Sequence, residues 1–220
     1  YDLKLISNQE PFTNLLTQGM VLKDGVKMSK SRGNVVSPED IVARYGADTA
    51  RLFILFAAPP ERDLEWSDKG VEGCYRFLKR VWRLAVPLAD FLKGVPLAPA
   101  ANLVGANREM RRITHRTIKK VSADIGDRFN FNTAVSAIME MVNALYQYKE
   151  IPETDRSPAV LREALDSLLL LLAPFAPHIT EEIWEATGHE GSIHLHPWPA
   201  YDPGAIQEDE ITIVVQINGK

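Results

Sequence analysis

The spacing of apolar residues predicts that most of this chain is helical. Over residues 67–92, apolar side chains recur at steps of three and four, as on the buried face of an amphipathic helix. The same period returns at 107–125, 132–148 and 157–173, and Leu168 to Leu172 is apolar on every side, which predicts a central helix. A last short helix is expected at 178–186. Short joints between long helices indicate an antiparallel bundle.

The first 60 residues follow a different pattern. We expect a short helix at 10–18, a short apolar strand at 19–22 and a polar, glycine-containing loop at 23–34. Ser37 and Pro38 begin a helix that ends at Gly46, and a second helix covers 48–57. Short elements therefore precede the bundle.

The end of the chain contains a strand signal. Residues 191–209 hold three prolines and indicate a linker, with Trp198 pinning it to the bundle. Apolar residues then alternate over 211–217, as in a half-buried strand, and lead into Asn218-Gly219, a strong hairpin signal. A hairpin turn without its returning strand predicts a fragment of a longer polypeptide, truncated just inside a further domain.

Composition removes several classes of protein. The chain has 220 residues, of which 45% are hydrophobic and 25% charged, as in soluble globular proteins. The chain has a single cysteine, Cys74, which excludes a disulfide framework. Cys74 lies on an apolar helix face, so we expect it to be buried rather than reactive. No apolar run reaches the ~18 residues that a membrane span needs, and we identify no leader. We therefore expect a cytoplasmic protein without membrane contact.

The charge is unevenly distributed. The net charge is −4, but residues 61–128 carry 14 basic and 9 acidic groups, whereas residues 129–220 carry 4 and 14. A basic middle segment is typical of a surface that faces an anionic partner. A solvated helix face would give the same pattern.

The candidate chemistry lies in one loop, Lys27-Met28-Ser29-Lys30-Ser31-Arg32-Gly33-Asn34. Two lysines three residues apart, interleaved with serines, suit a polyphosphate, because each ammonium group is a compact charge on a long stem. The hydroxyl and backbone N–H groups can donate further hydrogen bonds. Taken alone, such a pentapeptide is more often a solvated basic turn.

The surroundings of this loop carry a family resemblance. Residues 19–51 resemble the KMSKS region of class I aminoacyl-tRNA synthetases, including the Ser-Pro-Glu-Asp helix start and Tyr45-Gly46-Ala47-Asp48 with Arg51. Residues 58–84 resemble leucyl-tRNA synthetases, and 129–141 and 171–185 resemble their helical anticodon-binding domain. VVQINGK resembles the entry to their C-terminal domain. The HIGH motif, the amino-acid-binding Rossmann half and the editing domain would lie before Tyr1. Only residues 23–26 separate Leu22 from the motif, so the leucine-specific insertion of some members is missing.

The resemblance implies a mainly α fold in three parts. Residues 61–190 would form the antiparallel anticodon-binding bundle. Residues 1–60 would be the C-terminal tail of a Rossmann-like α/β catalytic domain with the KMSKS loop. Residues 191–220 would hold the linker and the first strand of a truncated C-terminal domain.

The resemblance also implies the reaction of a leucine–tRNA ligase. The leucine carboxylate attacks the α-phosphate of ATP, and the leucyl group then passes from the adenylate to tRNA(Leu). Lys27 and Lys30 would be catalytic, with Lys30 the stronger candidate for direct contact with ATP, and Mg²⁺ would accompany the nucleotide. The expected ATP-binding residues are Lys27, Met28, Ser29, Lys30 and Ser31. We expect a monomer, and we expect the fragment to be inactive alone because it lacks the HIGH half of the site.

Basic residues on the first two long helices are the candidate tRNA contacts. Four of them fall at four-residue steps on the second helix, a spacing that suits contacts along a phosphate backbone. The resemblance implies contacts to phosphates rather than readout of base edges. The full set is Lys79, Arg80, Arg83, Arg108, Arg112, Arg116, Lys119 and Lys120.

Two alternatives remain open, and a third is disfavoured. The chain could belong to a valyl- or isoleucyl-tRNA synthetase, or it could be a non-catalytic helical RNA-binding module. A metal site around His178, Glu181 and Glu182 is disfavoured, because the second histidine of a HExxH helix is missing and His194 and His196 fall in the linker. We therefore expect no metal ligands.

Overall fold

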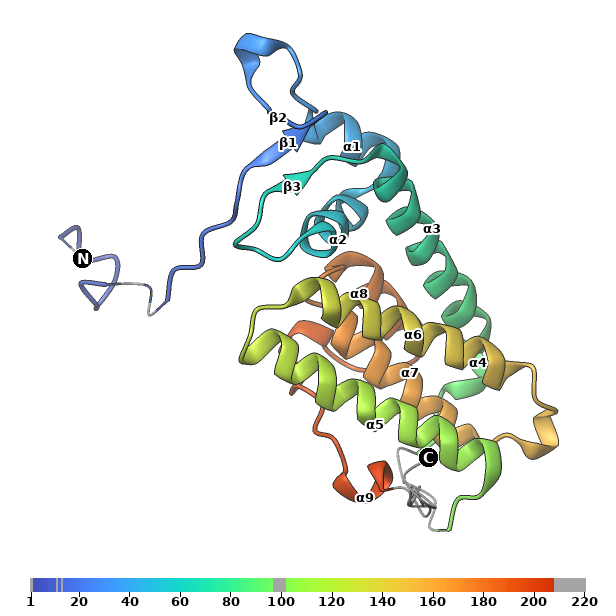
Figure 1. The fold of residues 1–220 in the computed structure, drawn as a ribbon. Coiled ribbons are helices and arrows are strands. Elements are labelled where there is room, and N and C mark those ends of the chain that lie inside the picture. The colour runs from blue at the N-terminus through green and yellow to red at the C-terminus, as the bar shows by residue number, and fades with distance from the viewer. Residues whose placement is uncertain (1, 11, 13, 97–101, 208–220) are drawn as a thin grey trace, which may run out of the picture.

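The computed structural model describes residues 2–10, 12, 14–96 and 102–207, so the strand and hairpin expected at 211–219 lie outside the described residues. The described fold is mainly helical, as the sequence predicts. A helical bundle forms one end of the molecule, and a small sheet with two short helices forms the other (Figure 1). None of the described helices is both long and apolar enough to cross a membrane.

The small sheet has the strand order β2-β1-β3. Its strands are β1 (Val21–Lys23), β2 (Val26–Lys27) and β3 (Leu64–Glu65), and β1 pairs antiparallel with β2 and parallel with β3. Gly19 lets the chain pass close to the segment before β3: its N–H donates to Pro60 O at 2.8 Å, and a Cβ there would lie 2.2 Å from Arg62 O. Two short helices, α1 (Pro38–Tyr45) and α2 (Ala47–Ala57), follow the hairpin.

The helix predicted at 10–18 is wrong. None of the described residues in that range is helical, and the side chains of Phe12 and Leu15 are 75% and 82% exposed. Short amphipathic helices depend on burying their apolar face against another element. These apolar side chains have no such partner among the residues that the structure describes.

The bundle is built from four long helices, as predicted. They are α3 (Asp68–Ala85), α5 (Gly105–Gly126), α6 (Phe131–Lys149) and α7 (Pro158–Leu172), and α8 (Pro177–Ala186) packs on α7. The period expected to continue to residue 92 is interrupted by a 3-10 turn, Val86–Leu88, before the short α4 (Ala89–Leu92). Pro87 causes this break, because it has no N–H to continue the helix.

The core confirms the central place of α7. The side chains of Leu165, Leu168 and Leu169 are fully buried. Ser157 caps the helix as predicted, since its Oγ accepts the N–H of Val160 at 3.4 Å.

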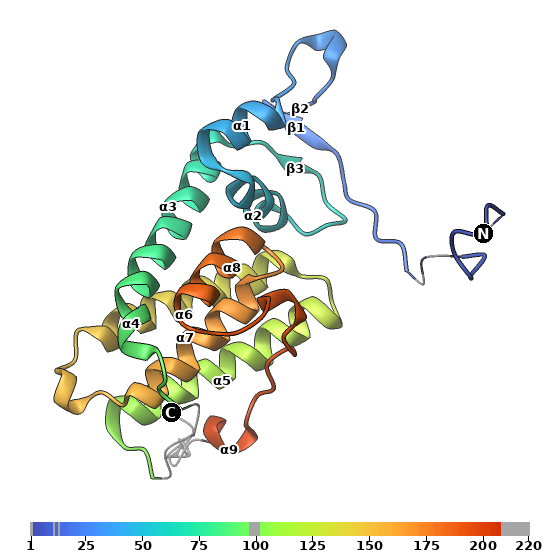
Figure 2. The ribbon, with the colours of Figure 1, turned by 180° about the vertical axis from the view of Figure 1, so that it is seen from behind.

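The linker at 191–207 is fastened to the bundle. It contains a 3-10 turn, Ile193–Leu195, and α9 (Pro203–Ile206), and it runs from α8 down beside α5 (Figure 2). As predicted, Trp198 pins it: its Nε1–H donates to Ser122 Oγ at 2.8 Å.

Candidate functional site

The KMSKS loop begins with a hairpin that the sequence interpretation missed. β1 and β2 pair Leu22 with Lys27, so Lys23 and Lys27 lie in strands rather than in the predicted loop. The turn residues Asp24 and Gly25 have φ angles of 55° and 70°, the left-handed values that an Asp-Gly hairpin turn requires. The Gly25 N–H also donates to Glu65 Oε1 at 3.1 Å, which ties the turn to β3. The hairpin fixes where the loop starts.

The rest of the loop is closed by Asn34. Its Oδ1 accepts the N–H of Ser29 at 2.9 Å, and its Nδ2–H donates to Lys27 O at 3.3 Å. Between these residues the chain makes one 3-10 turn, Lys30–Arg32, which ends at Gly33 with a φ of 67°. A single amide side chain therefore holds both ends of the segment that carries the second lysine.

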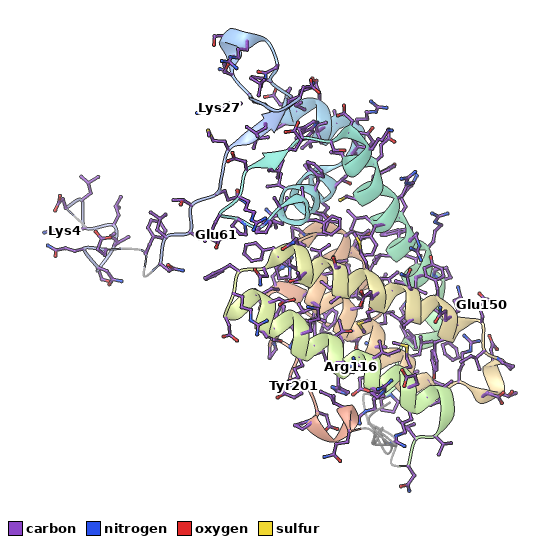
Figure 3. The ribbon with its side chains drawn as sticks, viewed as in Figure 1. Lys4, Lys27, Glu61, Arg116, Glu150 and Tyr201 are labelled. Carbon is purple, nitrogen blue, oxygen red and sulfur yellow. The ribbon has the colours of Figure 1, made fainter. Side chains whose placement is uncertain are left out.

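The loop presents unpaired positive charge. The side chains of Lys27 and Lys30 are exposed, and within the described ranges neither ammonium group forms an ion pair or a hydrogen bond. The hydroxyls of Ser29 and Ser31 lie 3.3 Å apart, and Met28 is half-buried. Lys27 lies at the end of the molecule away from α5, in the edge strand β2 of the small sheet (Figure 3). The loop can thus offer two cations and two hydroxyls to one anionic ligand.

The structure separates the three candidate cations of α3. Arg80 points to α6: its Nη2–H donates to Asn143 Oδ1 at 2.8 Å, and its guanidinium lies 5.0 Å from the centre of the Tyr146 ring. Lys79 and Arg83 instead line a hollow of about 630 Å³ between the α1–α2 corner, α3 and α8. The three residues therefore do not form one surface.

The stripe expected on α5 is partly neutralised. Arg112 is held by Glu109, with both hydrogen bonds at 2.8 Å, and Lys120 Nζ lies 2.9 Å from the buried carboxylate of Asp124. Arg108 is exposed near the start of the helix. Acidic residues three and four positions from a base are the usual partners on a helix surface.

A groove between α5 and α6 brings together three cations, one of which, Lys120, is the partner of Asp124. Its volume is about 610 Å³, and Arg116, Lys119 and Lys120 line it from α5. Ile206 of α9 also lines it, and Lys119 lies 5.4 Å from the centre of the Tyr201 ring. This groove is the part of the predicted tRNA surface where the structure brings several basic side chains together.

A partly buried polar cluster between α5, α7 and the linker was not predicted from the sequence. Arg111 pairs with Glu163 at 3.1 Å and with Asp202 at 3.0 Å, and His115 Nε2 lies 3.1 Å from Glu163. The Asp202 N–H donates to His115 Nδ1 at 3.1 Å, so the proton of the neutral ring lies on Nε2 and faces Glu163. Burial acts to raise the pKa of Glu163, but the hydrogen bond from His115 and the charge and hydrogen bond of Arg111 outweigh it, so this pKa is lowered. The cluster fixes the linker on α5.

The residues considered for metal binding serve other roles. His178 Nδ1 lies 2.7 Å from Asp48 Oδ1, and Glu181 accepts the Ser192 hydroxyl at 2.9 Å. Among the described residues, no group of three or more His, Cys, Asp or Glu side chains is placed to hold a metal ion. Cys74 is buried as predicted, and burial raises the pKa of its thiol to about 11.

Two family models and a solved structure match this chain. A family model of class I tRNA synthetases (I, L, M and V) matches residues 3–67, and a model of the anticodon-binding domain of tRNA ligase matches residues 107–220. A leucyl-tRNA synthetase (LeuRS) of Agrobacterium radiobacter, solved as a ternary complex with tRNA and LeuAMS, is 38% identical over 94% of this chain, with a TM-score of 0.80. The chain spans about a quarter of that protein, 26% of its length. This chain therefore belongs to the class I aminoacyl-tRNA synthetases, in the group of isoleucine, leucine, methionine and valine enzymes.

Proposed function

We propose that this chain is the part of a leucine–tRNA ligase that joins the ATP-binding loop to the tRNA-binding bundle. The ammonium groups of Lys27 and Lys30, which have no partner among the residues that the structure describes, and the closure of the loop by Asn34 carry this proposal. The 38% identity to a LeuRS favours leucine over valine or isoleucine. We also propose the division into a catalytic tail at 1–60, the bundle at 61–190 and a linker with a C-terminal strand at 191–220.

In this proposal the loop stabilises charge rather than transferring protons. The leucine carboxylate is ionised at neutral pH, so its attack on the α-phosphate needs no general base. Negative charge then spreads over the α-phosphate and the leaving pyrophosphate, where Lys30, and Lys27 beside it, would meet it. Ser29 and Ser31 can donate hydrogen bonds to phosphate oxygens. The motif contributes lysines and hydroxyls rather than carboxylates, so Mg²⁺ would be carried by the ATP phosphates.

The bundle would hold tRNA(Leu) through phosphate contacts. The groove between α5 and α6 is lined by the three basic residues Arg116, Lys119 and Lys120, one acidic residue, Glu140, and mostly apolar side chains otherwise. Lysine and arginine along a helix neutralise phosphates without reading base identity. Lys79, Arg80, Arg83, Arg108 and Arg112 remain proposed contacts, with Arg112 weakened by its pairing with Glu109.

Amino-acid-dependent exchange between ATP and pyrophosphate tests this function. The full-length synthetase that carries this chain should exchange label with leucine and much more slowly with valine, isoleucine or methionine. The 220-residue chain alone should not exchange, because the proposed amino-acid half of the site is not part of it. Exchange with valine or isoleucine in place of leucine would reassign the substrate, and no exchange with any of the four would favour a non-catalytic RNA-binding module.

A further inference from the structure

The N-terminus of α8 is capped by a residue from the other end of the molecule. α8 begins with Pro177, and Ala176 before it has no side chain that can accept a hydrogen bond. The N–H groups of His178 and Ile179 donate instead to Asp48, at 3.3 Å to Oδ1 and 2.7 Å to Oδ2. Asp48 lies 130 residues earlier, in the first turn of α2. The bundle thus takes one of its helix caps from the segment that follows the KMSKS loop.

The surroundings of Asp48 favour a buried carboxylate. Its exposed fraction is only 8%, yet both oxygens accept hydrogen bonds. Gly46, which precedes α2, has no side chain that could cap that helix. The Asp48 carboxylate therefore lies at the N-termini of both α2 and α8. Each N-terminus carries partial positive charge from its free N–H groups, which stabilises this carboxylate.

A second polar tie lies close to the first. Arg51, one turn further along α2, donates from Nη2 to Pro174 O at 3.0 Å, in the chain just before α8. A hollow of about 630 Å³ lies beside Asp48 and His178. One hydrophobic core connects α2 with α3 and α6, so the hydrogen bonds of Asp48 and Arg51 add directional contacts to the end of α8 at this junction.

We propose that Asp48 is a positioning residue that fixes the tRNA-binding bundle relative to the KMSKS loop. This inference rests on the proposed function. Formation of the adenylate requires the loop, whereas transfer to tRNA also requires that RNA held on the bundle presents its acceptor end at the adenylate. Asp48 connects the segment after the KMSKS loop to the bundle, so it should affect the transfer of leucine to tRNA rather than the formation of the adenylate. Misplacement of bound groups by about 1 Å can lower a rate by two orders of magnitude.

Two assays on the full-length synthetase separate positioning from general stability. Asp48→Ala should lower kcat/KM for tRNA in aminoacylation by about tenfold or more. Pyrophosphate exchange without tRNA should stay within about twofold of wild type.

Three further variants refine this test. Asp48→Asn should be intermediate, because an amide oxygen still accepts a hydrogen bond but carries no charge. Arg51→Ala, an exposed substitution that should not prevent folding, should act in the same direction and more weakly. Ser157→Ala is the matched control, since it removes a cap whose partners both lie within the bundle.

Hydrogen exchange on the 220-residue chain provides a readout independent of activity. In Asp48→Ala the backbone N–H groups of His178 and Ile179 should exchange faster than in the wild type, and in Ser157→Ala they should not. Equal losses in adenylate formation and aminoacylation, or no loss in either, would overturn the positioning role. If the wild-type synthetase shows no leucine-dependent exchange, the proposed function fails, while the exchange of these two amides still reports on the cap.

Discussion

Asn34 Oδ1 accepts the backbone N–H of Ser29 at 2.9 Å, and this bond closes the loop that carries Lys30. The same side chain donates to Lys27 O at 3.3 Å. The Asn34 amide therefore holds the end of the loop against its beginning, at Lys27 and Ser29. Asn34 thus fixes the shape of the loop, whereas the lysines provide its charge.

Substitution of Asn34 should impair the loop without removing its charge. Asn34→Ala in the full-length enzyme should lower the rate of leucine-dependent pyrophosphate exchange about five- to tenfold, since one hydrogen bond contributes about 1 kcal/mol. Asn34→Asp keeps an acceptor but loses the donor and adds negative charge beside the proposed phosphate site, so it should lose more. Equal exchange rates in wild type and Asn34→Asp would show that the loop does not meet anionic phosphates in this shape.

The close approach at Gly19 predicts a stability effect. Gly19→Ala should destabilise the fold by about 2 kcal/mol, because the added Cβ would meet Arg62 O and force the two chain segments apart. Gly73→Ala is the control: it lies inside α3, where a Cβ would meet nothing within 4 Å, and should stabilise by about 0.5–1 kcal/mol. Urea unfolding followed by circular dichroism measures both. A neutral Gly19→Ala would mean that this contact is not made in solution.

The lowered pKa of Glu163 predicts a pH dependence of stability. A carboxyl group whose pKa is lower in the folded state adds stability above its unfolded pKa, near 4.5, and loses this contribution as the pH falls through the folded value. Glu163→Gln should therefore destabilise by about 2 kcal/mol at pH 7 and flatten the loss of stability below pH ~4.5. Unfolding curves between pH 3 and 7 test this. An unchanged acid dependence in Glu163→Gln would contradict the assignment.

Arg116 should contribute to tRNA binding through charge alone. Arg116→Ala should weaken binding of tRNA(Leu) and of other tRNAs by similar factors, and should reduce the slope of log K against log salt by about 1. Lys93→Ala is the control, because this exposed lysine pairs with Asp90 outside the groove. Filter binding over a salt series gives both slopes. A change in slope as large in Lys93→Ala would show that the groove is not the site of contact.

The sequence predicts the bundle well because its signals are local. The apolar period marks α3, α5, α6 and α7, and Ser157 with Pro158 marks the start of α7. The loop hairpin was missed although Asp24-Gly25 carries the same kind of turn signal as Asn218-Gly219. Partial neutralisation of the α5 stripe could also have been read from the helical spacing of acidic and basic residues.

The remaining errors come from tertiary contacts. The helix expected at 10–18 fails because a short amphipathic helix needs a packing partner that the period does not reveal. The cap that Asp48 provides to α8 joins residues 130 positions apart, so no spacing rule could indicate it. Lys27 and Lys30 can be proposed from the sequence because the motif and the resemblance around it lie in one stretch of chain, whereas the division of the α3 cations between two surfaces required the fold.

The most direct test of the central claim is the rate of leucine-dependent pyrophosphate exchange in Lys30→Ala. If Lys30 meets charge that develops in the transition state, its loss should slow exchange by a factor of about one hundred or more, equivalent to about 3 kcal/mol, while leucine binding changes little. Lys30→Arg should restore only part of the rate, because a planar guanidinium does not reproduce a compact rotating charge. An exchange rate in Lys30→Ala within a few-fold of wild type would contradict the assignment of this loop to ATP.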